Sequence, residues 1–284
     1  MSHDEEALSF DCEGETLVGI VSGAARPAAR GVLIVVGGPQ YRAGSHRQFT
    51  LLARSLAGRG VPALRFDYRG MGDSGGGTRT FERAGGDIRC AIDRFFAAVP
   101  GLKEIVIWGL CDAASAALMY AHRDERVAGL VLLNPWVRTA QGLARAHLKH
   151  YYAKRLLQAG LWQKVVRGEF DFRGAAAAFG RMILDAAGRR RESAGSAAAG
   201  EAPFTERMEE GLRRFRGKVL LILSGNDLTA QEFRDFVAAS ARWRRLLEAE
   251  RVTRHDLPEA NHTFARRDWR EQVERWTGAW VESL

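Results

Sequence analysis

Short apolar runs alternate along the chain with longer segments in which apolar residues recur at helical spacing. Within residues 82–98, for example, Ile88, Ile92 and Phe95 share one face of a helix. Predicted strands cover residues 8–12, 16–21, 31–36, 61–66, 104–108, 127–133, 218–223 and 251–257. Predicted helices cover residues 46–58, 82–98, 112–122, 230–248 and 266–282. This alternation predicts an α/β fold with a mostly parallel sheet covered on both faces, and the opening hairpin supplies antiparallel edge strands.

The middle of the chain departs from this alternation. Residues 135–215 have helical character and many aromatic residues but no clear strand. Their tail, 188–203, is a low-complexity stretch of Gly, Ala, Ser and Arg that predicts a flexible loop. We therefore expect a helical lid at 135–215, inserted between the two parts of a core formed by 1–134 and 216–284.

Composition narrows the class of protein. The chain has 284 residues, of which 46% are hydrophobic and 27% charged, which suits one α/β domain with an insertion. The net charge of +8 comes almost entirely from arginine, and the longest Lys/Arg run is Arg189–Arg191. Without a recognisable nucleic-acid-binding module, this charge does not predict a nucleic-acid partner.

Cysteine usage and hydropathy bear on metal sites and location. Cys12, Cys90 and Cys111 are odd in number and far apart, so we expect no disulfide framework, and no ligand spacing predicts a metal. The N-terminus, M-S-H-D-E-E, lacks the apolar region of a secretory signal. The longest apolar runs, such as 32–36 and 127–133, are too short to span a membrane. These features predict a cytoplasmic protein with no membrane span.

The stretch V-I-W-G-L-C-D-A-A-S-A, residues 106–116, places a cysteine between a predicted strand and a predicted helix. This is the strand–turn–helix context of a nucleophile elbow, G-x-S-x-G, with Cys111 replacing serine and Ala113 replacing the second glycine. Gly109 leaves room for the turn, and the helix N-terminus favours a thiolate. The backbone N–H of Asp112 is then one oxyanion donor. The alternative is that Cys111 is an ordinary small buried residue.

A thiol nucleophile needs a base and an acid that orients the base. Asp227 follows a predicted strand in S-G-N-D, and His262 lies in the loop after the final strand. Both then lie at the same sheet edge as Cys111. Asp227 also suits a turn. His255, inside the preceding strand, is the less favoured candidate for the base.

Two loops complete the predicted site. G-G-P-Q, residues 37–40, follows the first buried strand, where such folds place the second oxyanion donor. Because Pro39 has no N–H, Gln40 or, as the alternative, Tyr41 must donate. The Gly-rich stretch R-F-D-Y-R-G-M-G-D-S-G, residues 65–75, lacks the patterns of nucleotide-binding loops, so we expect no cofactor. Its polar residues are expected to be structural, namely Asp67, Arg69, Asp73 and Ser74.

The order G-G-P-Q, F-D-Y-R-G-M-G-D-S, G-L-C-D-A, S-G-N-D and A-N-H-T-F resembles the α/β-hydrolase superfamily over almost the whole chain. More narrowly, G-G-P-Q-Y-R-A-G-S-H-R-Q-F, G-L-C-D-A-A-S-A and K-H-Y-Y-A-K-R-L-L are similar to the bacterial group called exosortase A system-associated hydrolase 1, which accompanies exopolysaccharide and protein-sorting gene sets. The resemblance implies an α/β-hydrolase fold and a triad of Cys111, Asp227 and His262. The cysteine departs from the usual serine and fits thiol-dependent relatives such as dienelactone hydrolases and polyester synthases.

These residues predict acyl chemistry on a small-molecule or carrier-bound acyl substrate. The first hypothesis is a hydrolase of esters or thioesters that forms a covalent acyl-thioenzyme. The second is an acyltransferase on the same triad, acting in exopolysaccharide-related metabolism. The third is a partner-binding module on a fold that has lost catalysis. The aromatic lid predicts a partly apolar pocket, and its basic residues either guide an anionic group or form a solvated helix face.

Overall fold

The computed structural model describes residues 4–23, 25, 27–38, 40–138 and 202–284. The chain divides into two compact units, one formed by 1–137 and 203–284 and the other by 138–202. The fold described below is that of the first unit. Most of the lid expected at 135–215, with its loop at 188–203, lies outside the described residues, so these boundaries stay predictions.

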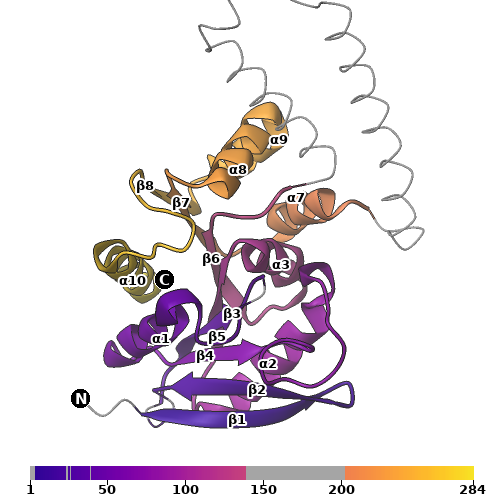
Figure 1. Ribbon diagram of the computed structural model, residues 1–284, viewed down its shortest axis with the longest axis vertical. Coiled ribbons are helices and arrows are strands. Elements are labelled where there is room, and N and C mark those ends of the chain that lie inside the picture. The colour runs from indigo at the N-terminus through magenta and orange to yellow at the C-terminus, as the bar shows by residue number, and fades with distance from the viewer. Residues whose placement is uncertain (1–3, 24, 26, 39, 139–201) are drawn as a thin grey trace, which may run out of the picture. The chain divides into compact units, whose positions relative to one another are not determined.

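One mostly parallel sheet organises the first unit (Figure 1). Its described strands are β1 (Glu5–Cys12), β2 (Glu15–Ser22), β3 (Arg30–Val35), β4 (Ala63–Asp67), β5 (Glu104–Leu110), β6 (Val127–Leu133), β7 (Lys218–Ser224) and β8 (Val252–Leu257). They lie side by side in the order β1-β2-β4-β3-β5-β6-β7-β8. The β1/β2 and β2/β4 pairs are antiparallel and all later pairs are parallel. The predicted parallel sheet with antiparallel edge strands is confirmed.

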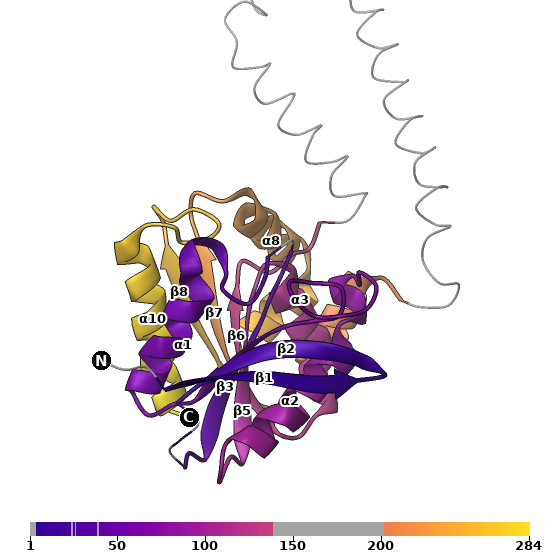
Figure 2. The same cartoon turned by 60° about the horizontal axis from the view of Figure 1, so that its bottom comes forward.

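Helices cover both faces of this sheet (Figure 2). The described helices are α1 (Gln48–Gly58), α2 (Gly85–Ala98), α3 (Asp112–Tyr120), α7 (Phe204–Arg214), α8 (Leu228–Ala239), α9 (Ala241–Leu247) and α10 (Arg267–Glu282), with 3-10 turns η1 (Ser45–Arg47), η2 (Phe81–Arg83) and η3 (Ala121–Arg123). Helices α1 and α10 pack on one face, and the others pack on the opposite face. None of these helices is long and apolar enough to cross a membrane.

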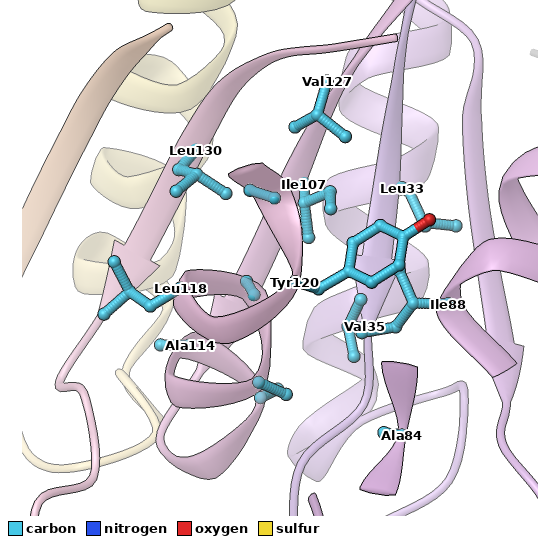
Figure 3. Packing of buried hydrophobic residues seen from close by; sticks show 14 of the residues in the cluster. Leu33, Val35, Ala84, Ile88, Ile107, Ala114, Leu118, Tyr120, Val127 and Leu130 are labelled. Atoms are coloured by element: carbon cyan, nitrogen blue, oxygen red, sulfur yellow. The ribbon is translucent and has the colours of Figure 1, made fainter. Parts of the chain in front are cut away.

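The central strands are buried on both sides, which explains their uninterrupted apolar sequences. In β3, Leu33 and Val35 belong to the core under α2 and α3, whereas Val32 and Ile34 belong to the core under α1 and α10. All four side chains are fully buried. Figure 3 shows the first of these cores, where Ile88 of α2 packs beside the β3 side chains. This packing gives the carboxyl ends of the strands a rigid base.

The helix expected at 230–248 is in fact two helices. Ser240 has extended backbone angles (φ −120°, ψ 116°) between α8 and α9, and its hydroxyl accepts a hydrogen bond from the Trp243 N–H at 3.3 Å. The break brings the buried Trp243 ring against Phe233 and Phe236, with ring centroids 6.0 and 5.6 Å apart. Serine as a helix N-cap, which competes with a continuous helix, accounts for the difference.

Helix α7 lies within the range expected for the lid, yet it packs with the core unit. Its Met208 and Leu212 are fully buried in the same cluster as α3. The Phe204 ring meets the Phe81 ring edge-on, with centroids 5.3 Å apart. Residues 204–214 therefore contribute to the core that supports α3.

The expectation of no disulfide framework needs a correction, because two of the three cysteines are joined. Cys12, at the end of β1, and Cys90, in α2, form a disulfide with a Cα–Cα distance of 5.7 Å. They are 78 positions apart in sequence, but β1 and α2 share one hydrophobic core. Sequence spacing does not show this proximity, which arises only when α2 packs against the opening hairpin. The third cysteine, Cys111, is free.

Candidate active site

Cys111 occupies a sharp turn between a strand and a helix. Strand β5 ends at Leu110, α3 begins at Asp112, and Cys111 between them has φ 63° and ψ −124°. A positive φ is uncommon for a residue with a side chain and is retained only where the surrounding structure imposes it. This is the strained geometry of a nucleophile elbow, which presents the side chain at the carboxyl edge of the sheet.

Backbone hydrogen bonds hold this turn from both sides. The Cys111 N–H donates to the Leu133 carbonyl at 2.9 Å, and the Cys111 carbonyl accepts from the N–H groups of Ala114 (3.1 Å) and Trp136 (3.2 Å). The buried Ser115 hydroxyl donates to the Trp136 carbonyl at 2.7 Å. The segment after β6 therefore supports the turn, so the position of Cys111 does not depend on its own loop alone.

Small residues let α3 start directly behind β5. A Cβ on Gly109 would lie 2.7 Å from the backbone carbon and oxygen of Ala113, so only glycine fits there without a shift. Ala113, which replaces the second glycine of the serine motif, is buried with 1% exposure. Its methyl group therefore packs into the interior, and the departure from the motif is compatible with the elbow.

His262 and Asp227 meet at the same edge of the sheet. Nδ1 of His262 lies 2.9 Å from Oδ2 of Asp227. Asp227 is also the N-cap of α8, where its carboxylate accepts hydrogen bonds from the N–H groups of Thr229 (3.2 Å) and Ala230 (3.0 Å). The turn role and the pairing role expected of this residue therefore coexist. The Cys111 side chain, after that of Asp227, also raises the pKa of His262, so both other members of the predicted triad act on the imidazole.

Backbone hydrogen bonds join the loop after β7, which carries Asp227, to the loop after β8, which carries His262. The Gly225 N–H donates to the Leu257 carbonyl at 2.9 Å, and the Asn226 N–H donates to the Ala260 carbonyl at 3.0 Å. A Cβ on Gly225 would lie 2.1 Å from the Pro258 carbonyl oxygen, so this close approach requires glycine. The distance between acid and base is therefore set by backbone contacts.

Sequence reasoning missed Asn134, which links three parts of the site. This fully buried residue follows β6 with φ 44°. Its Oδ1 accepts from the Ser224 N–H at 2.9 Å, and its Nδ2 donates to the Ser224 hydroxyl at 2.8 Å and to the His262 carbonyl at 3.2 Å. The sequence does contain one indication of this role, an asparagine directly after an apolar strand, at the edge where ligands bind in such sheets. Asn134 positions the backbone of the histidine loop.

The electrostatics favour a charged His262–Asp227 pair. The hydrogen bond to Asp227, then the nearby Cys111 side chain and the charge of Asp227, raise the pKa of His262 to about 10, although burial opposes the shift. Burial acts to raise the pKa of Asp227, but the hydrogen bond and charge of His262, with the two N-cap hydrogen bonds, hold that pKa below its usual value. The imidazole is therefore well placed to hold a proton beside the thiol sulfur.

The two predicted oxyanion donors have different surroundings. Asp112 begins α3, and its own carboxylate accepts a hydrogen bond from the Gly38 N–H at 2.9 Å. Burial raises the pKa of this carboxyl group, although nearby N–H groups and the His262 charge act in the opposite direction. Gln40 is half-buried, and its side-chain oxygen accepts from the Ser45 N–H at 3.1 Å. Donation by the Gln40 N–H to an oxyanion stays a prediction.

The remaining candidates lie outside this constellation. The His255 ring stacks on the Trp276 ring, with centroids 4.4 Å apart and planes 13° from parallel.

The polar residues of 65–75 form hydrogen bonds and ion pairs with other residues of the chain: Asp67 accepts from the Arg42 N–H, Arg69 pairs with Asp87 and Glu13, Asp73 pairs with Arg42, and Ser74 donates to the Asp67 carbonyl. Across the described part of the chain, no group of three His, Cys, Asp or Glu residues is arranged to hold a metal ion.

Solved structures with the same architecture include an esterase and other hydrolases. An esterase from Pyrococcus furiosus superimposes with a TM-score of 0.65 over 99% of this chain and 93% of its own, at 16% identity. Est1E from Butyrivibrio proteoclasticus, solved with ferulic acid bound, gives 0.62 over 98% of both chains, also at 16% identity. A predicted CIB-like hydrolase from Thermoplasma acidophilum gives 0.61 over the full length of both chains, at 12% identity. At these identities the likeness shows a shared fold.

No curated protein sequence matches the chain. The sequence model of the alpha/beta hydrolase family, in contrast, matches residues 32–276, which include most of β3 at one end, most of α10 at the other and all three predicted triad residues. With this match, the eight-stranded sheet and the elbow at the end of β5, the chain belongs to the alpha/beta hydrolase family.

Proposed function

We propose that this protein hydrolyses ester or thioester bonds, with Cys111 as nucleophile, His262 as proton carrier and Asp227 as the group that orients His262. The observation that carries the proposal is the position of His262. Its imidazole hydrogen-bonds with Asp227, and the strained elbow residue Cys111 also raises the pKa of this imidazole. A nucleophile, a base and an orienting acid in contact are the parts that covalent acyl transfer requires.

The reaction runs in two steps. In the first, His262 takes the proton of the Cys111 thiol, the sulfur attacks the acyl carbonyl carbon, and a tetrahedral oxyanion forms. As this intermediate collapses, the bond to the leaving oxygen or sulfur breaks, and the leaving group takes a proton from His262. In the second, His262 removes a proton from water, and the water oxygen attacks the thioester carbonyl. As the second tetrahedral intermediate collapses, the C–S bond breaks, the acid is released and His262 returns a proton to the sulfur, so the enzyme returns to its starting state.

The choice of a thiol bears on the substrate class. A thiolate is a better leaving group than an alkoxide, so an intermediate formed from an unactivated amide tends to revert. Thioesters, activated esters and lactones suit it better. The esterase with the same fold, and the ferulic acid bound in Est1E, support an ester or related acyl substrate for this chain. The same acyl-thioenzyme can also pass its acyl group to another nucleophile, which is the acyltransferase hypothesis with its link to exopolysaccharides.

The test is turnover of a panel of acyl thioesters and activated esters by the purified protein. Cys111→Ala and His262→Ala are expected to lower kcat/KM by at least about a thousandfold, since triad members act as a unit. His255→Ala is the matched control, because its ring stacks on Trp276 and does not contact Asp227 in the structure. Full turnover in Cys111→Ala would contradict the proposal, and so would an equal loss in both histidine variants.

A further inference from the structure

The side chain of Asp112 folds back over the start of its own helix. Its Oδ2 accepts a hydrogen bond from the Gly38 N–H, in the loop after β3, at 2.9 Å. Burial raises the pKa of this carboxyl group, and the N–H groups of Gly38, Ala113 and Asp112 itself act to lower it. An N–H group of the β3 loop thus bonds to a carboxylate at the start of α3, one residue after Cys111.

These donors belong to the position where an acyl oxyanion would form. In a nucleophile elbow, the oxyanion binds the N–H of the residue after the nucleophile and one N–H of the loop after the corresponding early strand. In this chain those groups are the Asp112 N–H and the Gly38 N–H, and the Gly38 N–H donates to the Asp112 carboxylate. The geometry therefore makes Gly38 a second candidate for the donor expected at Gln40.

The carboxylate is enclosed but only half satisfied. Its other oxygen, Oδ1, is buried and has no hydrogen-bond partner among the described residues. A Cβ on Gly37 would lie 2.2 Å from this oxygen, so the carboxylate packs directly against the glycine. Burying a carboxylate oxygen without a hydrogen-bond partner is unfavourable. The Asp112 side chain therefore loses little stabilisation when it moves out of this position.

We propose that the Asp112 carboxylate is a resident occupant of the oxyanion site and must move out before an acyl carbonyl can be attacked. This inference rests on the proposed function of Cys111, and it adds a way in which access to the same site is regulated. A carboxylate has the charge and hydrogen-bonding pattern of the oxyanion, so the two compete for the same N–H groups. Asp112 thus acts through the oxyanion donors and restricts acylation to donors that displace it.

Asp112→Ala empties the site, whereas Asp112→Asn leaves a neutral side chain of the same shape that still accepts from Gly38. Both variants remove one negative charge near Cys111, so both change the amount of thiolate. The rate of Cys111 alkylation by iodoacetamide, which forms no oxyanion, corrects for that change. The measured quantity is the ratio of the acylation rate by p-nitrophenyl acetate to the alkylation rate. Asp93→Ala, which removes an exposed carboxylate paired with Arg126, is the control.

The ratio is expected to rise about tenfold in Asp112→Ala, less in Asp112→Asn, and not in Asp93→Ala, because one oxyanion donor is worth about a hundredfold or more in rate. A ratio that is unchanged or lower in Asp112→Ala overturns the inference. A second experiment measures alkylation of Cys111 in the presence of acetate. In Asp112→Ala, acetate would bind in the oxyanion site beside Cys111 and slow its alkylation.

The acetate experiment separates the two proposals. If neither the wild type nor any variant is acylated, the proposed function has failed. Protection of Cys111 from alkylation by acetate then still tests whether the Asp112 carboxylate occupies the oxyanion site. Protection in Asp112→Ala but not in the wild type supports a resident carboxylate. Equal protection in both proteins, or none in either, overturns it.

Discussion

The Asn134 side chain donates a hydrogen bond to the backbone carbonyl of His262 at 3.2 Å. The same amide pairs with the N–H and the hydroxyl of Ser224 at the end of β7. One buried side chain therefore joins the ends of two neighbouring strands to the loop that carries the proposed base. The acid and base are positioned by the framework of the sheet edge as well as by their contact with each other.

Asn134→Asp keeps the shape of this side chain but replaces the hydrogen bond to the His262 carbonyl with repulsion, whereas the Ser224 hydroxyl can turn to donate to the new carboxylate. We expect the free energy of unfolding to fall by about 1–3 kcal/mol, because the His262 carbonyl loses its donor. We also expect a larger effect on kcat than on KM, since the histidine loop loses its support while no substrate contact is removed. Denaturant unfolding and steady-state kinetics measure these effects. Wild-type stability with an unchanged kcat would show that Asn134 does not position His262.

The proton on His262 depends on both of its neighbours, and on Asp227 more than on Cys111. Asp227→Asn is therefore expected to lower the pKa of His262 from about 10 by more than Cys111→Ala does. NMR titration of the imidazole in the three proteins gives the order directly. An imidazole that titrates near its ordinary value of 6.5 in the wild type would contradict the charged pair.

The same shift predicts how stability depends on pH. Because the pKa of His262 is raised from 6.5 to about 10 on folding, its protonation stabilises the folded chain fully below about pH 6.5. That contribution is lost as the pH rises towards 10. The difference in unfolding free energy between the wild type and Asp227→Asn should therefore narrow between pH 6 and pH 10. Asparagine is also a good N-cap, so the capping of α8 is largely retained in the variant. A difference that stays constant or widens over this range would refute the prediction.

The disulfide between Cys12 and Cys90 closes a loop of 78 positions, so it restricts the unfolded chain. We expect reduction, or Cys90→Ser, to lower the free energy of unfolding by about 2–4 kcal/mol. Cys111→Ser should respond to reductant as the wild type does, because Cys111 is free. Denaturant curves with and without reductant provide the measurement. Equal stability of the oxidised and reduced wild type would contradict a structural role.

Gly225 sets the approach of the two loops that carry Asp227 and His262. In Gly225→Ala, the new Cβ would meet the Pro258 carbonyl oxygen at 2.1 Å, so the loops must separate. We expect a loss of about 1–3 kcal/mol in stability, together with lower activity. Gly58→Ala, at the end of α1, meets no atom within 4 Å and should be neutral or stabilise by up to about 1 kcal/mol. Similar effects of the two substitutions would argue against a close-packed loop pair.

Much of the fold and the grouping of Cys111, Asp227 and His262 follow from the sequence, because each residue comes directly after a recognisable strand. In a parallel sheet those positions converge at one edge. Features that depend on spatial neighbours do not follow in this way. The Cys12–Cys90 bond needs α2 to pack beside β1, and the role of Asn134 needs β6 to lie next to β7.

The predicted role of Asp112 involved only its backbone. Its carboxylate accepts from the Gly38 N–H because a short acidic side chain at a helix start readily bonds to nearby amides, a local choice that periodicity does not reveal. The break at Ser240 has a similar origin, since a serine N-cap competes with a continuous helix.

The most direct test of the account is whether Cys111 carries the acyl group. The wild type and Cys111→Ala would be mixed with acyl thioesters and activated esters, and the intact mass and the modified peptide would be determined within the first turnover. The account predicts a mass increase equal to one acyl group, on the peptide containing Cys111, in the wild type alone. An acyl adduct of the same size in Cys111→Ala, or turnover of these donors without any adduct on Cys111, would contradict it.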